Sequence, residues 1–334
     1  MFVSLVMAQI RRRLLGVCSG LALLLVLPVQ ASDDAIVWLE EMAQAVHQLS
    51  YVGTFIYQQG DSLQTLRIIR SVTDEGEFER LVSMSGQTRE VIRARDRVTC
   101  ILPEDSSIVL EQANTPRPFT AIPIERLAFL GDYYEIRLGG SERIAGLVAR
   151  QVDILPRDPY RFGQRIWLDE QSRLPLRAEV FNEQGVVLEQ LIFTSLEIRD
   201  EIPGEMLQPQ VGARDQILEL EHDPLPRSTM RRSPPAWQST DLPPGFNQKV
   251  QRRHFLPNKF YQVEHHVYSD GLASVSVFIE QRDDDERILL GASRIGGVNI
   301  YGHVHNGYLI TVLGEVPVVT VQRIARSMVQ VSKR

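Results

Sequence analysis

The chain has 334 residues, which is long enough for two domains and a sizeable buried core. It carries 36 Lys and Arg against 42 Asp and Glu, a formal charge of −6 at pH 7. An acidic chain repels phosphates overall, so the composition argues against a nucleic-acid-binding protein.

Residues 1–31 have the pattern of a secretory signal peptide. Three arginines, Arg11 to Arg13, precede an apolar run from Leu14 to Leu27, and Ala31 closes a small-residue cleavage site. The run is too short for a stable membrane anchor, and no later run is long and apolar enough to be one. We therefore expect cleavage after Ala31 and a soluble, exported mature protein. Cleavage removes three arginines and no acid, so the mature charge is −9.

The two cysteines indicate neither lipid attachment nor a disulfide. Cys18 follows Val17, whereas a lipoprotein cysteine follows a small residue. Cys100 is the only cysteine left after cleavage, which excludes an internal disulfide. The apolar residues around it favour an inert strand position over a reactive thiol.

The first domain is expected over residues 32–205. Ser32 to Leu49 has apolar residues at helical spacing and predicts an amphipathic helix. From Tyr51 the period changes to two, and turn residues recur about every ten positions. This pattern indicates a curved antiparallel sheet or an open barrel, with one helical interruption from Pro123 to Leu130.

The stretch from Gln164 to Leu196 shows the sheet pattern most clearly. Its middle run alternates apolar and charged residues, which places the apolar set on one face. A sheet with one apolar face must bury it against something. Either the protein's own side chains fill the space, or a lipid chain enters it. The candidates for such a cavity are Phe55, Tyr57, Leu66, Ile68, Leu176, Ala178 and Val180.

A proline-rich connector over residues 206–244 separates the first domain from a second one over residues 245–334. Proline cannot donate to a sheet ladder, so we expect an extended linker there. The second domain has hairpin signals at Asp270-Gly271 and Asn306-Gly307. Pro317 opens a predicted helix. The apolar stripe of that helix is Val321, Ile324, Ala325, Met328 and Val331.

The sequence contains no familiar catalytic motif. It has no G-x-S-x-G elbow, phosphate loop, H-E-x-x-H helix or C-x-x-C pair, so we expect no enzyme, metal or cofactor. The acidic run Arg282 to Glu286 lacks the ligand pattern of a calcium loop and is interpreted as a solvated hairpin tip. His303 and His305 alternate on one strand and could complete a zinc triad with His265 or His266. A solvated face or a pH-sensitive interface is favoured over metal.

Longer stretches of the sequence resemble one family. In the second domain these are His266 to Glu280, HVYSDGLASVSVFIE, and Ile310 to Pro317, ITVLGEVP. In the first domain they are Leu49 to Tyr57, Glu79 to Val82 and Arg89 to Ile92. The chain is similar over almost its whole mature length to the RseB/MucB family of periplasmic regulators.

The resemblance implies a mainly β (α+β) fold: an unclosed antiparallel barrel with helices, like that of lipoprotein carriers, followed by a smaller antiparallel sheet with a covering helix. It also implies a negative regulator that binds the periplasmic segment of a membrane-spanning anti-sigma factor and protects it from a site-1-type protease. Lipopolysaccharide or a lipoprotein acyl chain entering the first domain would release that segment.

The partner segment is expected to add to a strand edge of the second domain. The candidate contacts are Asp270, Gly271, Val275, Phe278, Gly314 and Glu315. The sequence leaves self-association open. A lipoprotein or lipid carrier is the alternative function, because the first domain alone would suit one.

Overall fold

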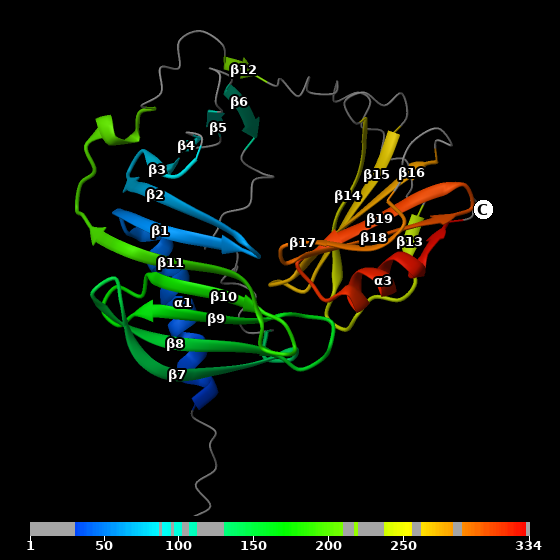
Figure 1. The fold of residues 1–334 in the computed structure, drawn as a ribbon, viewed down its shortest axis with the longest axis horizontal. Helices are drawn as coiled ribbons and strands as arrows, with labels where there is room; N and C mark the ends of the chain where they lie inside the picture. The colour runs from blue at the N-terminus through cyan, green and yellow to red at the C-terminus, as the bar shows by residue number, and fades with distance from the viewer. Residues whose placement is uncertain are drawn as a thin grey trace, which may run out of the picture.

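The computed structural model describes residues 31–86, 89–94, 97–101, 107–111, 130–209, 217–219, 237–255, 262–282 and 289–331. Within these ranges the chain forms a large β-domain followed by a smaller one (Figure 1). The expected signal peptide up to Gln30, all but the last residue of the helix from Pro123 to Leu130, and the acidic run from Asp283 to Glu286 lie outside them. None of the described helices combines the length and the apolar character that a membrane crossing needs.

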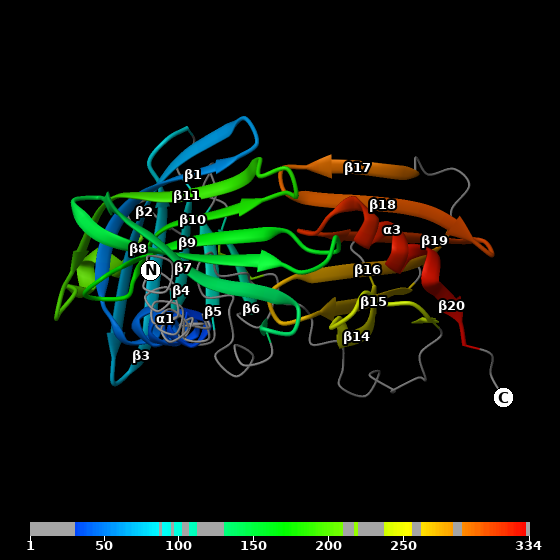
Figure 2. The ribbon, with the colours of Figure 1, turned by 90° about the horizontal axis from the view of Figure 1, so that it is seen from below.

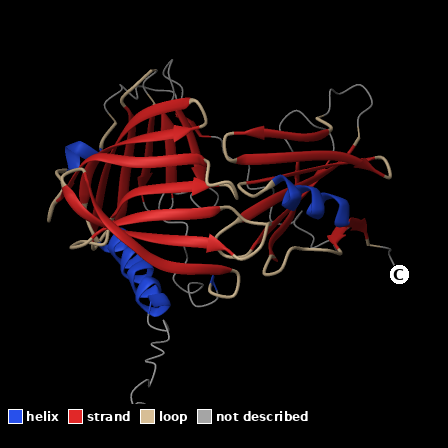
Figure 3. Ribbon diagram, turned by 60° about the horizontal axis from the view of Figure 1, so that its bottom comes forward, coloured by secondary structure: helices blue, strands red, loops and turns tan. Residues whose placement is uncertain are grey.

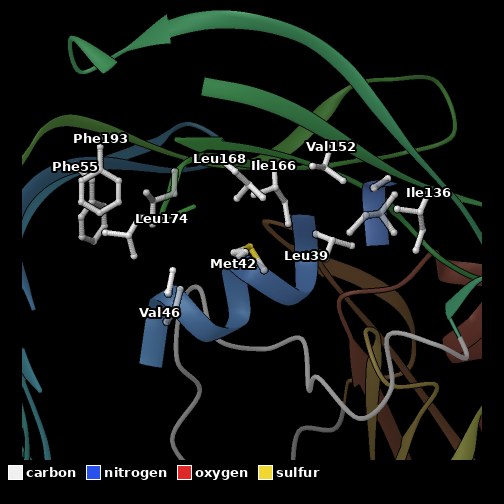
Figure 4. Packing of buried hydrophobic residues seen from close by; sticks show 14 of the residues in the cluster. Leu39, Met42, Val46, Phe55, Ile136, Val152, Ile166, Leu168, Leu174 and Phe193 are labelled. Carbon is white, nitrogen blue, oxygen red and sulfur yellow. The ribbon is translucent and has the colours of Figure 1, made fainter. Parts of the chain in front are cut away.

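The first domain begins with α1, Ala31–Gln48, which confirms the predicted amphipathic helix. Its apolar face lies against the concave side of the sheet (Figures 1 and 3). Leu39, Met42 and Val46 point from this helix toward the strands (Figure 4). Each is at most 2% exposed, so the helix is held by burial of its apolar stripe.

The large sheet has twelve strands, and all neighbouring pairs except β12–β6 are antiparallel. Its order is β12-β6-β5-β4-β3-β2-β1-β11-β10-β9-β8-β7, and its two end strands do not pair with each other (Figure 2). The expected unclosed barrel is confirmed. The strands are β1 Tyr51–Gln59, β2 Ser62–Thr73, β3 Gly76–Ser83, β4 Glu90–Ala94, β5 Arg97–Ile101, β6 Ser107–Glu111, β7 Tyr134–Ile144, β8 Leu147–Pro156, β9 Gly163–Asp169, β10 Pro175–Phe181, β11 Val187–Ile198 and β12 Ile217–Glu219.

One register detail differs from the sequence pattern. The pairing of β10 with β9 shifts between Pro175 and Arg177, and this bulge turns Leu176 away from the concave face. Leu176 is fully buried in a separate cluster with Trp167 on the other side of the sheet. The prediction that it shares a face with Ala178 is therefore wrong, because a bulge interrupts the period of two.

The outer side of the first sheet carries one further element, the 3₁₀ turn η3, Gly204–Leu207. Met206 and Leu207 pack there with Ile202, Val52 and Ile69. The segment after β11 therefore closes over the back of β1 and β2 before the chain leaves the domain.

The second domain is a six-stranded antiparallel sheet covered by one helix, as expected (Figure 2). The sheet order is β14-β15-β16-β19-β18-β17. The elements are β13 Trp237–Ser239, β14 Asn247–Phe255, β15 Gln262–Ser269, β16 Ser274–Gln281, β17 Gly291–Ile295, β18 Val298–His305, β19 Tyr308–Gly314, α3 Val318–Ser327 and β20 Met328–Gln330. The core joins the inner face of the sheet to α3 and to Trp237, which is 2% exposed.

The turns and the end of the helix show where local sequence was informative. Asn306 and Gly307 have φ angles of 50° and 78°, which confirms the two-residue hairpin turn. The helix after Pro317 forms, but it ends at Ser327. Met328 begins β20, which pairs with β13, so the predicted helical stripe is wrong from that residue on.

Candidate functional site

The concave face of the first sheet carries most of the predicted cavity residues. Phe55 and Ile68 are 2% and 5% exposed and belong to the apolar cluster that packs on α1. The rings of Phe55 and Phe193 are 5.4 Å apart between centroids and tilted (Figure 4). Tyr57 and Leu66 are partly buried at the border of this cluster. The face is apolar and continuous from β1 to β2.

The β10 candidates are divided between the two faces. Ala178 lies opposite Ile166 and Leu191, which are both in the concave cluster, so it shares their face. Val180 lies two residues further along the same strand, opposite Gln164. Leu176 packs behind the sheet, as described above. The structure thus brings six of the seven candidates to one side of the sheet.

A row of ionised side chains borders the apolar face, and the sequence analysis missed it. The register aligns Tyr51 with Arg70, Arg70 with Glu79, and Glu79 with Arg93. Because Tyr51 is in the concave cluster, the row shares that side of the sheet. Arg70 is 1% exposed and lies 3.4 Å from Glu79 and 2.9 Å from Glu77. Burial raises the pKa of Tyr51, so the phenol stays neutral beside this row.

The two domains meet in a buried ion pair between Arg161 and Asp270. Arg161 follows β8, Asp270 sits in the β15–β16 turn, and neither side chain is exposed. Arg161 Nε donates to Asp270 Oδ2 over 2.5 Å, and the Tyr134 hydroxyl donates to the same oxygen over 2.9 Å. Burial, followed by the charge of Asp270, raises the pKa of Tyr134 well above its usual value. The phenol therefore keeps the proton that it donates.

The guanidinium of Arg161 has further partners from both domains. It donates to Asp158 in its own loop and to the Pro244 carbonyl just before the second sheet. It also lies 4.9 Å from the ring centroid of Tyr133 and 5.0 Å from that of Phe246. A charge pair this deep is stable only with such a full set of partners.

The turn that carries Asp270 also reaches the first domain's core. Asp270 Oδ1 accepts hydrogen bonds from the backbone amides of Leu272 and Ala273, which fixes the turn. Leu272 packs against the concave apolar cluster of the first sheet. One turn of the second domain is therefore in contact with the surface that was predicted to hold a lipid.

A second contact joins the β8–β9 loop to α3. Thr320 Oγ1 donates to the Tyr160 carbonyl over 2.8 Å, and Arg323 donates to the Tyr160 hydroxyl over 2.5 Å. Arg323 also forms a two-point ion pair with Asp241, at 3.0 and 2.5 Å. This contact ties the covering helix of the second sheet to the first domain.

A third contact lies where the β17–β18 turn meets β1 and β11. Glu189 accepts hydrogen bonds from the Tyr57 hydroxyl at 3.0 Å, Gln59 at 2.7 Å and the backbone amide of Gly297 at 3.1 Å. Loss of solvation, and secondly the charge of Glu189, raise the pKa of Glu315. Tyr57, a predicted cavity residue, therefore also belongs to the domain interface.

The predicted partner contacts occupy three environments. Asp270 and Gly271 lie in the turn that docks on the first domain, and Val275 is fully buried in the core. The ring of Phe278 stacks on His265, with centroids 4.3 Å apart. β16 pairs with β15 and β19, and β19 pairs with β16 and β18. Neither is an edge strand, so the expectation of strand addition there is wrong.

The pairing of β19 also fixes the positions of Gly314 and Glu315. Gly314 lies opposite Val275 and Asn299, and a side chain at this position would meet the Ser274 carbonyl oxygen at 2.5 Å. Glu315 lies next in the chain, at the third interdomain contact. These two residues lie at the domain junction.

The histidines of the second domain are dispersed. His266 is fully buried and bonds to Glu264 at 2.9 Å, while the rings of His303 and His305 are 6.3 Å apart. Burial of Glu264 would by itself raise its pKa. Hydrogen bonds from His266 and Arg253 outweigh this effect and lower the pKa of Glu264 to about 2. Within the described ranges no group of three His, Cys, Asp or Glu side chains is arranged to hold a metal.

The fold and the junction define a class: a two-domain binding protein whose smaller domain is docked by buried polar contacts onto the apolar concave side of an open β-barrel. Two family models match the chain, the MucB/RseB N-terminal domain over residues 34–211 and the MucB/RseB C-terminal domain over residues 231–329. The chain belongs to the MucB/RseB family.

Named relatives agree over most of the length. The sigma factor AlgU regulatory protein MucB of Pseudomonas aeruginosa is 33% identical over 312 residues, covering 91% of this chain and 94% of that protein. The sigma-E factor regulatory protein RseB of Escherichia coli K12 is 26% identical, covering 87% and 89%. Among solved structures, the complex of P. aeruginosa MucA and MucB matches with a TM-score of 0.71 and 30% identity, over 90% of this chain and all of the matched chain.

Proposed function

We propose that this chain is a periplasmic negative regulator that binds the periplasmic segment of a membrane anti-sigma factor and shields it from a site-1-type protease. One observation carries the proposal. Both domains match the family in order, and a relative with the same two-domain fold has been solved as "MucB in complex with MucA(peri)". The partner seen there belongs to the relative, and the 30% identity over 90% of this chain supports the same partner class here.

The apolar concave face supplies the sensing half of the proposal. An acyl chain of lipopolysaccharide or of a lipoprotein would bind among Phe55, Ile68 and Leu66, where apolar side chains are concentrated.

The junction gives a physical route from lipid to partner. Leu272 and Tyr134 both touch the concave cluster, and both lead directly to Asp270. A lipid that displaces these side chains binds best when the domains are undocked, and this differential affinity is what a ligand needs to shift an equilibrium. A coupling of about 1–3 kcal/mol would change partner affinity by roughly 5- to 150-fold.

Proteolysis of the partner tests the shielding half. The purified periplasmic segment of the same organism's MucA- or RseA-type anti-sigma factor would be incubated with a site-1-type protease, with and without the mature chain. We expect cleavage to slow as the chain is added, and lipopolysaccharide to restore the rate. An unchanged rate at saturating protein would remove the proposal.

A lipid carrier is the second candidate, because the apolar face belongs to the first domain alone. The three interdomain contacts argue against it, since a carrier needs no second domain to hold a ligand. Transfer of a labelled lipoprotein between two membrane preparations by the purified chain would favour the carrier function.

A further inference from the structure

The second sheet has two edges, and they differ in how they are protected. The sheet order places β14 at one end and β17 at the other. An edge strand presents unpaired backbone groups, and proteins usually block such edges with charges, prolines or bulges. The composition of each edge therefore shows whether it is built to stay unpaired.

The β14 edge is blocked. Its pairing with β15 contains a bulge between Gln248 and Val250, and three cations lie on the strand, Lys249, Arg252 and Arg253. The outer strand of the large sheet, β7, is similar, with a bulge between Leu138 and Ser141. Both edges carry the features that prevent another strand from pairing.

The β17 edge lacks these features. Its pairing with β18 is regular, it contains no proline, and Arg294 is its only charged residue. Ile295 on this strand is 67% exposed, and Leu289 and Leu290, which directly precede the strand, are 50% and 59% exposed. Within the described ranges no strand pairs with its outer side. An edge that is regular, apolar and unblocked is suited to accept an extended peptide.

The hairpin geometry identifies the groups that face outward. Ile295 and Val298 flank a two-residue turn and form a hydrogen-bonded pair. Since such pairs alternate along an antiparallel ladder, Arg294 and Ala292 direct their backbone N–H and C=O groups away from β18. The side chain of Ala292 is exposed, so this position is accessible to a new strand.

The same edge runs to the domain junction. Gly296 and Gly297 follow Ile295 directly; Gly297 donates to Glu189, and Gly296 lies so close to Gln59 that a side chain would meet it at 2.3 Å. On the first domain Val187, two residues before Glu189 in the chain, is 42% exposed. Figure 2 shows the end of β17 beside the β10–β11 hairpin.

We infer that the β17 edge binds an extended, apolar segment of the anti-sigma partner as an added strand, with its end reaching the first domain beside Gln59 and Glu189. This inference rests on the proposed function. Five strand residues span about 17 Å, enough for a short peptide to be held by its backbone. A segment in contact with both domains loses part of its site when they undock, which links its affinity to the lipid-sensitive junction.

Replacing Ala292 by proline tests the edge with little effect on the fold. Ala292→Pro removes an outward N–H that β17 does not use in its own ladder, and proline is accepted on an edge strand where the N–H faces solvent. Ala292→Thr is the matched control, because it keeps the N–H. We expect the partner's periplasmic segment to bind the proline variant about tenfold more weakly, and the threonine variant like wild type. Calorimetric titration measures both.

Two further measurements make the test independent of one variant. The β17 amides of the wild-type chain should exchange hydrogen more slowly in the complex than in the free protein. Ile295→Lys should also weaken binding, whereas Val148→Lys, at an exposed apolar site on β8, should not. If wild type binds but Ala292→Pro, Ile295→Lys and amide exchange show no effect, the inference is overturned while the proposed function stands.

A second copy of the chain is the rival occupant of this edge. If Ala292→Pro changes only the molar mass in light scattering and leaves partner binding unchanged, the edge serves self-association, and the inference is overturned. If the wild-type chain does not bind the segment at all, the proposed function itself fails.

Discussion

In both domains a helix covers one face of a sheet, but the apolar side chains on that face are buried to different extents. In the second domain no residue of the buried cluster under α3 is more than 4% exposed. In the first domain α1 runs closest to β7 and β8, while Leu66, Leu81 and Tyr57 remain partly buried over the other strands. Buried charges, including Arg70, lie on that same side of the sheet. Among the described residues, eleven apolar side chains around the first core are only partly buried, against four around the second, so the first domain covers its apolar face less completely.

The largest expected effect is at the contact that joins these two regions. Asp270→Ala removes the fully buried carboxylate that pairs with Arg161 and accepts from Tyr134, and leaves the guanidinium with the Asp158 carboxylate as its ion partner; it should lower the free energy of unfolding by about 3–5 kcal/mol. Guanidinium unfolding followed by tryptophan fluorescence measures the loss. The double variant Arg161→Met, Asp270→Leu should recover much of it, because the buried guanidinium is removed as well and Asp158 is partly exposed to water. A loss below about 1 kcal/mol in the single variant would mean that this ion pair does not hold the domains together.

Matched truncations in the two cores test the difference between them directly. Ile324→Ala removes a fully buried side chain from the second core and should cost about 2–5 kcal/mol. Leu66→Ala truncates a partly buried side chain and should cost about 1 kcal/mol, because less surface returns to water. Thermal unfolding of the two variants provides the comparison. Equal losses would show that the concave face is packed as tightly as the second core.

Acid should affect the second domain through Glu264. Its pKa of about 2 means that its ionised form is stabilised by folding, so the stability it contributes is present above the ordinary value near 4.5. That contribution, about 1–2 kcal/mol after solvent screening, should be lost as the pH falls from about 4.5 to 2. Glu264→Gln should flatten the pH dependence of unfolding in this range. A variant with the wild-type profile would assign the acid sensitivity to other carboxylates.

The sequence predicted what local patterns and turns determine. The helix after Ala31 and the Asn306-Gly307 turn follow from spacing and backbone preference, and both are confirmed. The bulge at Leu176 was not predictable in this way. The alternation of apolar and charged residues in the sequence looks the same with or without a bulge, but the bulge turns Leu176 to the opposite face of the sheet. The helix after Pro317 ends earlier than predicted, because Met328 pairs in a strand with Ser239, which lies 89 residues upstream.

The site was predictable in the first domain and much less so at the junction. Phe55 and Tyr57 on one strand, and Leu66 and Ile68 on the next, are spaced two residues apart, and that spacing places each pair on one face. Arg161 and Asp270 are 109 positions apart, and each has an ordinary turn-like context in the sequence. Only the folded arrangement shows that they pair. Tertiary contacts of this kind carry no local signal, although the resemblance to a two-domain family implied that the domains work together.

The smallest expected effect concerns Glu189 and Glu315, where the two domains meet at β17. The pKa of Glu315 is raised by loss of solvation and by the charge of Glu189, so the docked state holds a proton more tightly than the undocked one. Docking should therefore be strongest below the ordinary pKa near 4.5 and weaken as the pH rises through the raised value. Glu189→Gln removes one cause of the shift and weakens one hydrogen bond to Gly297, a net change of about 0.5–1 kcal/mol.

Interdomain energy transfer between dyes, recorded from pH 4 to 7, should show a flatter profile for this variant. Glu135→Gln, an exposed carboxylate on β7, should retain the wild-type profile. A Glu189→Gln profile identical to wild type would show that this end of the junction does not respond to charge, and docking would then depend on Asp270 and α3.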